Sequence, residues 1–415
     1  MERRVVVTGI GTVNPLGNNV EDSWQAVKRG ENGISALDRF DPEQFPSKVC
    51  GVVKNLDPDN YIDRKEARKY DRFSLLALVA SMEAMKGAGL ETNRNGLDPE
   101  RFGVIIGNGI GGIDTLTDAY RSLFYKGPMR IHPLTIPKMI CNIGPGNVAI
   151  RFNAQGPCYA VVTACASGTD AIGHAFQSIV TNQTDIMIAG GTEAPVTEIA
   201  MGGFATIQTL SRGYNDSPER ASRPFDKDRD GFVLAEGAGI LILEELEHAK
   251  KRGAAILAEL AGYGLSCDAN HLTAPHPEGR GAVQAMTMAL RAANMRPEDI
   301  DYINAHGTST TLNDPIESKA IKVVFGEHTG RLKVSSTKSM TGHMIGGAGG
   351  FEAAVSIMAL RDQFFPPTRN HDNPDPECDL DYVPNQGYSG RIRAVMSNSL
   401  GFGGHNGVLI FKAYT

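Results

Sequence analysis

The chain has no run of about 18 consecutive apolar residues, so it lacks a segment of the length that a membrane-spanning helix requires. It also lacks an excess of positive charge. Its 41 Lys and Arg residues against 47 Asp and Glu give a formal net charge of −6, which argues against a nucleic-acid-binding protein. Only six cysteines occur, without the spacing of a small disulfide-bonded scaffold. With no signal-peptide pattern at the N-terminus, these absences predict a cytoplasmic protein.

Glycine, by contrast, is abundant, with 47 residues. Short apolar runs alternate with stretches of helical periodicity, which is typical of an α/β fold with largely parallel sheets. Strands are expected at residues 5–8, 103–107, 185–189, 332–335 and 394–397. Helices are expected at residues 73–87, 169–180, 281–293 and 352–360.

The length of 415 residues predicts two domains or a duplicated one. Gly253 follows the cationic end of a helix predicted over 244–252, and a new strand is expected from Ala254. We therefore divide the chain into residues 1–252 and 253–415. The two parts end alike over 231–243 and 401–411, each expected to be a closing hairpin, which favours duplication of one βαβ unit.

Cys165 lies where an apolar, β-branched run stops and small residues open a predicted helix. A thiol at the start of a helix faces backbone N–H groups and the positive end of the helix dipole, and both favour the thiolate. Because the thiolate is the nucleophile, this position suits attack on a carbonyl carbon. The alternative for any single cysteine is a buried and inert side chain.

Three glycine-rich segments carry further reactive side chains: His306 in the first, Lys338 and His343 in the second, and Phe402 in the third. One histidine beside Cys165 would suit acyl transfer, with the imidazole deprotonating the thiol. Two neutral imidazoles would instead stabilise an oxyanion or an enolate. Metal binding is disfavoured because the residues lack the spacing of common ligand motifs.

Residues 107–112 match the G-x-G-x-x-G pattern after a predicted strand. A dinucleotide site would also need an acidic residue at the end of the next strand, about 20 residues on. The segment at that distance, 126–130, contains no acidic residue and does not resemble a strand. We therefore expect a tight backbone loop that lines a pocket rather than a nucleotide site.

Four motifs, in this order along the chain, resemble the signatures of the β-ketoacyl-acyl-carrier-protein synthases. They are TAC at 163–165, NAHGTST at 304–310, SSTKSMTGH at 335–343 and GFGG at 401–404. The resemblance covers essentially the whole chain, and the closest type is synthase II of bacterial fatty-acid synthesis. It implies the thiolase fold, with two similar α/β halves in a five-layer αβαβα sandwich, and a homodimer.

The resemblance implies a decarboxylative Claisen condensation. An acyl chain passes from the phosphopantetheine of acyl carrier protein to Cys165, with the backbone N–H groups of Cys165 and Phe402 as the oxyanion hole. Malonyl-carrier protein then loses CO₂, and His306 and His343 stabilise the enolate that attacks the acyl group and lengthens it by two carbons. Lys338 gives electrostatic support, and Phe402 gates the pocket. The chain itself holds no organic cofactor.

The resemblance also implies residues that bind substrate, a cation and the partner. The substrate-binding positions are Ile110, Thr308, Thr310, Gly401 and Gly403. In some relatives a monovalent cation lies near the positions of Asn304, Glu352, Ser397 and Asn398, whose oxygen atoms suit a hard cation and hydrogen-bonding support equally. The basic run with Lys65, Arg68 and Lys69 is expected to form one side of a helix together with Arg72, where it would attract the acidic carrier protein.

Other proteins of the same fold leave rival interpretations. A thiolase would carry a second catalytic cysteine near its C-terminus, where this chain has residues 401–404. A starter synthase would have asparagine in place of His343, and a chain-length-factor subunit, which is not an enzyme, would lack Cys165. A ketosynthase of polyketide or specialised-lipid synthesis stays open, because the motifs are common to both uses.

Overall fold

The computed structural model describes residues 3–91 and 97–414, and its two halves contain sheets of the same strand order. The first sheet comprises β1 (Val5–Val13), β4 (Phe102–Gly107), β5 (Cys158–Val161), β6 (Ile186–Glu193) and β7 (Gly237–Glu245). The second comprises β8 (Ala258–Cys267), β9 (Tyr302–Asn304), β10 (Lys333–Ser335), β13 (Ala394–Gly401) and β14 (His405–Lys412). The order in space is β5-β4-β6-β7-β1 and β10-β9-β13-β14-β8, so every strand has a counterpart in the other half.

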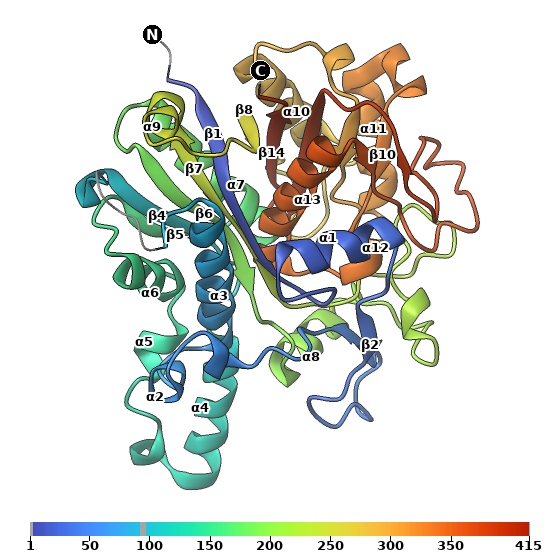
Figure 1. Ribbon diagram of the computed structural model, residues 1–415. Helices are drawn as coiled ribbons and strands as arrows, with labels where there is room; N and C mark the ends of the chain where they lie inside the picture. Colours follow the sequence, from blue (N-terminus) through green and yellow to red (C-terminus); the bar gives the residue numbers. More distant parts are fainter. Residues whose placement is uncertain (1–2, 92–96, 415) are drawn as a thin grey trace.

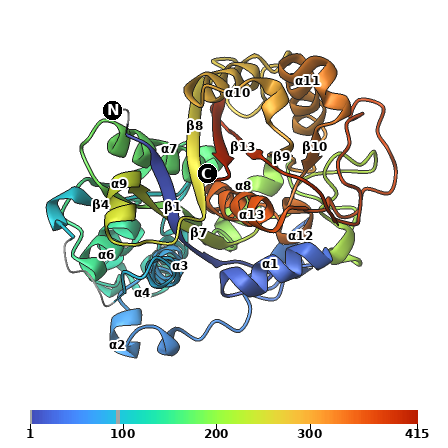
Figure 2. The same ribbon diagram turned by 45° about the horizontal axis from the view of Figure 1, so that its top comes forward.

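The two sheets meet where β1 and β8 pair antiparallel, with Val5 opposite Leu260, and this contact makes one 10-stranded sheet (Figure 2). In each half three strands are parallel, namely β5, β4 and β6 in the first and β10, β9 and β13 in the second. The remaining two strands of each half run antiparallel. The sheets are therefore mixed, and the expectation of largely parallel sheets is wrong, because two strands of each half pair antiparallel with their neighbours.

Helices complete five layers (Figure 1). Between the sheets lie α7 (Ser167–Val180), which contacts β6 and β14, and α13 (Ala348–Asp362), which contacts β7 and β13. The outer face of the first sheet is covered by α3 (Arg72–Gly87) and α6 (Ile143–Phe152), and that of the second by α10 (Arg280–Ala292) and α11 (Asn313–Phe325). This is the αβαβα sandwich that the family resemblance implies.

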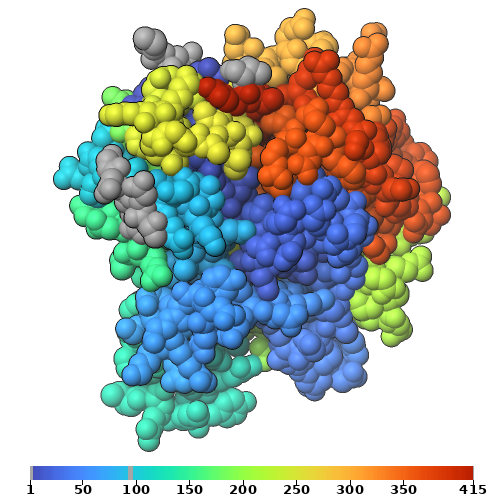
Figure 3. All heavy atoms as spheres, in the orientation of Figure 1, coloured from blue at the N-terminus to red at the C-terminus, as the bar shows by residue number. Residues whose placement is uncertain are grey.

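The remaining helices and strands connect these layers. They are α1 (Val20–Arg29), β2 (Ile34–Ala36), β3 (Val49–Gly51), α2 (Arg64–Ala67), α4 (Ile113–Lys126), α5 (Thr135–Met139), α8 (Glu198–Thr206), α9 (Leu246–Lys251), α12 (Lys338–Thr341), β11 (Phe364–Phe365) and β12 (Tyr388–Ser389). On the face shown in Figure 3, the N-terminal segment packs against the C-terminal half, where Trp24 Nε1 donates to Asp362 at 2.7 Å. Within 3–91 and 97–414, no helix has the length and apolarity needed to cross a membrane.

Glycine sets how closely the inner helices approach the sheets. A Cβ atom on Gly239 of β7 would lie 2.2 Å from the backbone nitrogen of Phe351 in α13. One on Gly191 of β6 would lie 2.1 Å from the carbonyl oxygen of Gly346, in the turn that leads into α13. Neither contact can relax, because the opposing atoms belong to the backbone. The glycine content of the chain therefore reflects backbone packed directly on backbone.

One predicted boundary and one predicted hairpin are wrong. The strand expected from Ala254 begins at Ala258, because residues 254–257 are still crossing from α9 to the sheet. The ending at 401–411 belongs to a hairpin, β13–β14, but that at 231–243 does not. The last residues of the segment 231–243 form β7, which pairs antiparallel with β6. The two strands are separated in sequence by α8 and a long loop, so they do not form a hairpin. The division at 252/253 lies between α9 and β8.

Candidate active site

Cys165 stands in a short 3-10 turn, Ala164–Ala166, between β5 and α7. Ala164 has a φ of 51°, in the left-handed region that residues with a side chain rarely adopt. Ser167 supports this conformation, since its hydroxyl accepts from the Thr163 N–H at 2.9 Å and donates to the Ala164 carbonyl at 2.6 Å. The strained turn directs the Cys165 side chain into a cavity.

The cavity has a volume of about 230 Å³ and is lined by Cys165, His306, His343 and Phe402. The sulfur of Cys165 and a ring nitrogen of each histidine lie within 4.8 Å of one another. The two imidazoles meet edge to face, with ring centroids 5.3 Å apart. Residues from four distant segments therefore line a single cavity, as the sequence predicts. The apolar part of the lining includes Phe204, Phe232, Ile345 and Leu400.

Lys338 fixes the orientation of His306. Its ammonium donates to the carbonyl oxygen of His306 at 2.7 Å, forms an ion pair with Glu352, and lies 3.4 Å from His306 Nδ1. An ammonium group has three N–H donors and no lone pair, so His306 Nδ1 is the acceptor in this contact. The ring proton of His306 is thereby assigned to Nε2. This arrangement supports the expected electrostatic role of Lys338.

Both imidazoles are uncharged at neutral pH. Burial lowers the pKa of His306 well below its usual value, and the neighbouring charge of Lys338 lowers it further. The pKa of His343 is lowered by the same two causes. Neither ring nitrogen of His343 has a hydrogen-bond partner within the described part of the chain. A neutral ring with one N–H and one lone pair is thus available to a substrate.

The expectation of a thiolate at the helix start is wrong for this structure. Burial raises the pKa of the Cys165 thiol to about 12, although the charge of Lys338 and a hydrogen bond from the Phe402 N–H lower it in part. The free-energy cost of removing a charged sulfur from water exceeds the stabilisation that the helix end, Lys338 and the Phe402 N–H give to the thiolate. The site therefore holds a protonated thiol beside neutral imidazoles.

Phe402 lies in a glycine loop between β13 and β14. Gly403 and Gly404 have φ values of 83° and 78°, a conformation that glycine adopts without strain. A Cβ atom on Gly401 would lie 2.7 Å from the carbonyl oxygen of Thr163. The loop therefore reaches the nucleophile turn closely enough for the Phe402 N–H to hydrogen-bond Cys165.

A carboxylate of the protein itself occupies the glycine loop at 107–112. Glu193, at the end of β6, accepts hydrogen bonds from the backbone N–H groups of Gly109, Ile110 and Gly111, and from that of Gly346. Burial raises the pKa of Glu193 to about 7. The donors that a phosphate would need are engaged, which supports the interpretation of a backbone loop. Sequence reasoning missed Glu193, although an acid that ends a strand after two glycines is a usable signal.

Three of the five predicted substrate-binding residues line the cavity: Thr308, Thr310 and Gly401. The other two lie beside it. Ile110 packs on the apolar cluster around Cys165, and the Gly403 N–H donates to the carbonyl oxygen of Leu272 at 2.8 Å.

Glu317 of α11 also supports the site, because it accepts the N–H groups of His306 and Gly307 at 2.8 Å each. Sequence reasoning missed it. Glu317 lies 11 residues after His306, on the helix that follows its loop, and no local pattern indicates the contact.

Three of the four residues expected near a cation share one side of the second sheet. Ser397 of β13 lies opposite Asn304 of β9, and Glu352 comes from α13, which packs on β13. The Ser397 hydroxyl, the Asn304 side-chain oxygen and one Glu352 oxygen are buried without a hydrogen-bond partner in the described residues. The side chain of Asn398 projects from the opposite face of β13, where its Nδ2 lies 3.4 Å from Glu317 Oε1.

The basic run is not one helix. Helix α2 ends at Ala67 and α3 begins at Arg72, because Asp71 caps α3 by accepting the Phe73 N–H. Arg72 is only partly exposed and forms an ion pair with the buried Glu236, contrary to the expectation that it shares an exposed face with its neighbours. Lys65, Arg68 and Lys69 are exposed and have no ion pair among the described residues.

Comparisons with known proteins agree with this geometry. The family described as "Beta-ketoacyl synthase, N-terminal domain" matches residues 2–249, and "Beta-ketoacyl synthase, C-terminal domain" matches residues 257–372. The chain is similar to a protein of Synechocystis sp. named 3-oxoacyl-[acyl-carrier-protein] synthase 2. The two are 50% identical over 413 residues, which cover 100% of this chain and 99% of that protein.

Solved structures give the same result. A β-ketoacyl synthase from Burkholderia phymatum STM815 superposes with a TM-score of 0.92 at 33% identity, over 100% of both chains. A ketosynthase solved in complex with its type II polyketide acyl-carrier protein superposes with a TM-score of 0.92 at 37% identity, also over 100% of both chains.

The protonated thiol predicts the pH dependence of Cys165 alkylation. Because burial raises its pKa to about 12, the rate of carbamidomethylation by iodoacetamide should rise steadily between pH 7 and 10. Mass spectrometry of the peptide that contains Cys165 measures this rate, and exposed Cys158 serves as an internal reference. A plateau at or below pH 8 would show instead that the resting site holds a thiolate.

Proposed function

The chain belongs to the β-ketoacyl synthase family, and on that basis we propose how its own residues carry out the reaction. It is a condensing acyltransferase, which extends an acyl chain by two carbons taken from malonyl-acyl carrier protein with loss of CO₂. The observation that carries the assignment of residues is the meeting of one thiol and two neutral imidazoles within 4.8 Å on one cavity.

In the first step the Cys165 sulfur attacks the thioester carbonyl of the acyl group on the pantetheine arm. The negative oxygen that forms is stabilised by the backbone N–H groups of Cys165 and Phe402. The C–S bond to pantetheine breaks, and the acyl chain is left on Cys165. The thiol proton passes to the departing sulfur through the neutral His343 ring, which has no other partner among the described residues.

In the second step malonyl-carrier protein occupies the same cavity, and its carboxylate leaves as CO₂. The electron pair remains as an enolate, whose oxygen is stabilised by the Nε2–H of His306 and an N–H of His343. The enolate carbon attacks the acyl carbonyl, the C–S bond to Cys165 breaks, and the thiolate takes a proton from water. Neutral imidazoles suit this step, because they donate hydrogen bonds without readily protonating the carbon.

A metal ion held by Cys165 and the two histidines is the competing use of the same atoms. Their separation of within 4.8 Å would allow it. The condensation, however, needs the sulfur free for a covalent bond to the acyl group. We therefore assign these three residues to catalysis and not to a metal.

A monovalent cation fits beside Lys338 instead. The unpaired oxygens of Asn304, Glu352 and Ser397 would hold it, and it would add a second positive charge next to the Lys338–Glu352 ion pair. The thermal midpoint should then be higher in potassium chloride than in choline chloride at equal ionic strength. Equal midpoints across the alkali cations would leave these oxygens as hydrogen-bonding support alone.

The carrier protein is the partner to which acyl and malonyl groups are attached. Lys65 and Lys69 line a cleft with Lys138 and the apolar side chains of Leu134 and Ile150. Lysines beside exposed apolar side chains suit an acidic, amphipathic surface. We propose that this cleft, together with Arg68, receives the carrier protein.

A second copy of the chain is the proposed neighbour of β5. This strand ends the sheet, and Tyr159 and Val162 are 40% and 52% exposed there. An unpaired edge with apolar side chains is typical of a strand that pairs with another copy. Light scattering should give twice the mass of one chain, and a monomer at micromolar concentration would contradict this.

A cytoplasmic location stays a prediction.

The assignment of residues predicts separate effects on the two half-reactions. Cys165→Ala should abolish formation of an acyl adduct, while Cys158→Ala should leave it intact. His306→Ala should still accept the acyl chain but lower the rate of malonyl decarboxylation by about 10²- to 10³-fold, because one enolate donor is lost. Intact-protein mass after addition of acyl-carrier protein, and then of malonyl-carrier protein, measures both steps.

The outcomes of that experiment separate the rival interpretations. An adduct formed from acyl-coenzyme A but from no carrier-bound acyl group would indicate a coenzyme A-dependent relative. Discharge as a polyketone rather than as a single two-carbon extension would indicate polyketide synthesis. An acyl adduct on Cys165→Ala would overturn the choice of nucleophile.

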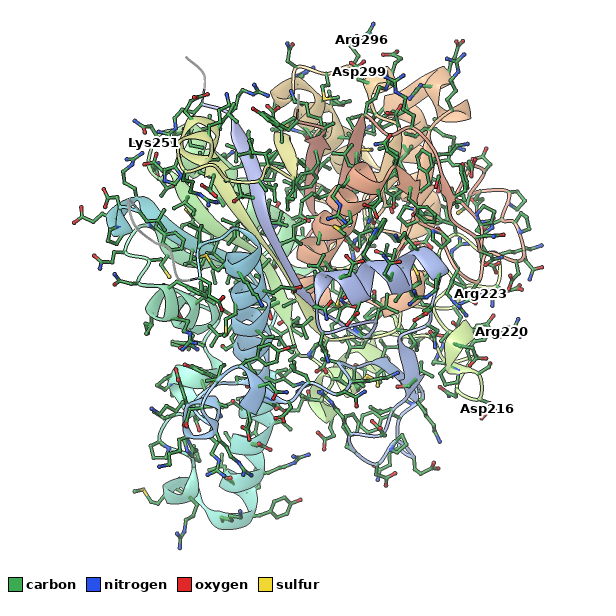
Figure 4. The ribbon with its side chains drawn as sticks, viewed as in Figure 1. Asp216, Arg220, Arg223, Lys251, Arg296 and Asp299 are labelled. Atoms are coloured by element: carbon green, nitrogen blue, oxygen red, sulfur yellow. The ribbon has the colours of Figure 1, made fainter. Side chains whose placement is uncertain are left out.

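Charge reversal tests the docking surface. Lys65→Glu combined with Lys69→Glu should raise KM for acyl-carrier protein by about tenfold at low salt, because the partner is acidic. The effect should shrink at high salt. Acyl-pantetheine, which lacks the protein, should react as with wild type. Lys251→Glu on α9, far from α2 in the view of Figure 4, is the control. An equal effect of this control would contradict a local docking site.

A further inference from the structure

Asp170 is a buried carboxylate that the steps above do not use. It lies in α7 shortly after Cys165, and 0% of its surface is exposed. Its Oδ2 accepts a hydrogen bond from the Thr163 hydroxyl at 2.6 Å, and its Oδ1 accepts one from the Tyr263 hydroxyl at 3.0 Å. Both carboxylate oxygens therefore have hydroxyl donors, one from each half of the molecule.

Two glycines leave room for the contact between Asp170 and Tyr263. A Cβ atom on Gly173 would lie 2.4 Å from the ring of Tyr263, and one on Gly407 would lie 2.4 Å from Asp170 Oδ1. Only glycine at these two positions lets the ring and the carboxylate reach one another. The contact is thus built by residues of α7, β8 and β14 together.

Thr163 connects Asp170 to the nucleophile. It immediately precedes Ala164, whose φ of 51° is the strained point of the turn. A strained conformation persists only where its neighbours hold it from several directions. Ser167 holds the backbone of the turn, and Asp170 holds the side chain of Thr163.

Tyr263 connects Asp170 to the second half. It belongs to β8, which pairs with β14, and β14 follows the loop that carries Phe402. The nucleophile comes from the first half, while the Phe402 N–H that meets it comes from the second. The Tyr263–Asp170 hydrogen bond joins the same two halves close to this meeting point.

We propose that Asp170 is a positioning residue that, through Thr163 and Tyr263, keeps the Cys165 sulfur aligned with the oxyanion-hole N–H of Phe402. The proposal rests on the function proposed above. Loss of the contact should let the strained turn relax and move the sulfur relative to the acyl carbonyl. Displacements of about 1 Å at a reacting centre can cost about 10²-fold in rate.

The test is the single-turnover rate of Cys165 acylation, measured by quenched-flow mass spectrometry over a range of acyl-carrier-protein concentrations. Thr163→Val removes the hydroxyl and keeps the shape of the side chain. The matched control is Thr8→Val, because the buried Thr8 hydroxyl also donates to a carboxylate, that of Glu244, in the first sheet away from the cavity. Melting midpoints of both variants show whether their losses of stability are comparable.

Thr163→Val should lower the maximal acylation rate by about ten- to a hundredfold with little change in half-saturating concentration, and Thr8→Val should stay within about twofold of wild type. Asp170→Ala should act like Thr163→Val. Asp170→Asn should recover most of the rate, because the amide can still pair with both hydroxyls.

Wild-type rates in Thr163→Val and Asp170→Ala would overturn the proposal, and so would an equal loss in Thr8→Val. If Asp170→Ala does not fold, Thr163→Val decides. Failure of the wild-type protein itself to form an adduct would refute the proposed function instead, so the two failures are distinguishable.

Discussion

The ion pair between Lys338 and Glu352 is the interaction on which the rest of the site depends. Both side chains are almost fully buried, at 1% exposure each, and a buried charge persists only with a partner. The pair brings an ammonium group to the carbonyl oxygen and Nδ1 of His306, and this fixes which nitrogen of His306 carries the proton. The charge of Lys338 also lowers the pKa of His343 and that of Cys165. Removing one partner would leave an uncompensated charge at the centre of the molecule.

Burial of the site has one physical consequence for all three reactive groups, namely that each is uncharged at rest. It lowers the pKa of His306 and His343 and raises that of Cys165. Uncharged imidazoles donate hydrogen bonds to a developing enolate. An uncharged thiol becomes a nucleophile only when a proton acceptor lies beside it and takes its proton. Reactivity is therefore governed by contact with the substrate and not by a standing thiolate.

Glycine determines where backbone can approach backbone, and this sets the distances within the site. Gly239 lets α13, which carries Glu352, pack directly on β7, and Gly401 lets the Phe402 loop approach Thr163. Glu193 accepts hydrogen bonds from the N–H groups of Ile110 and Gly111. It thereby holds the glycine loop at 107–112 next to the apolar cluster around Cys165. The two halves supply different groups to one cavity, and close packing keeps those groups in register.

The sequence by itself predicted the α/β class, the duplication, and the residues Cys165, His306, His343 and Lys338 that meet at the cavity, because these are carried by local patterns. Periodicity and glycine-rich segments report on neighbours along the chain. Three features were decided only by the tertiary structure: the protonated state of Cys165, the ion pair of Arg72 with Glu236, and the contacts of Glu193, Glu317 and Asp170. Each depends on burial or on a partner far away in sequence. Desolvation and long-range contacts are properties of the packed molecule, so no pattern along the chain contains them.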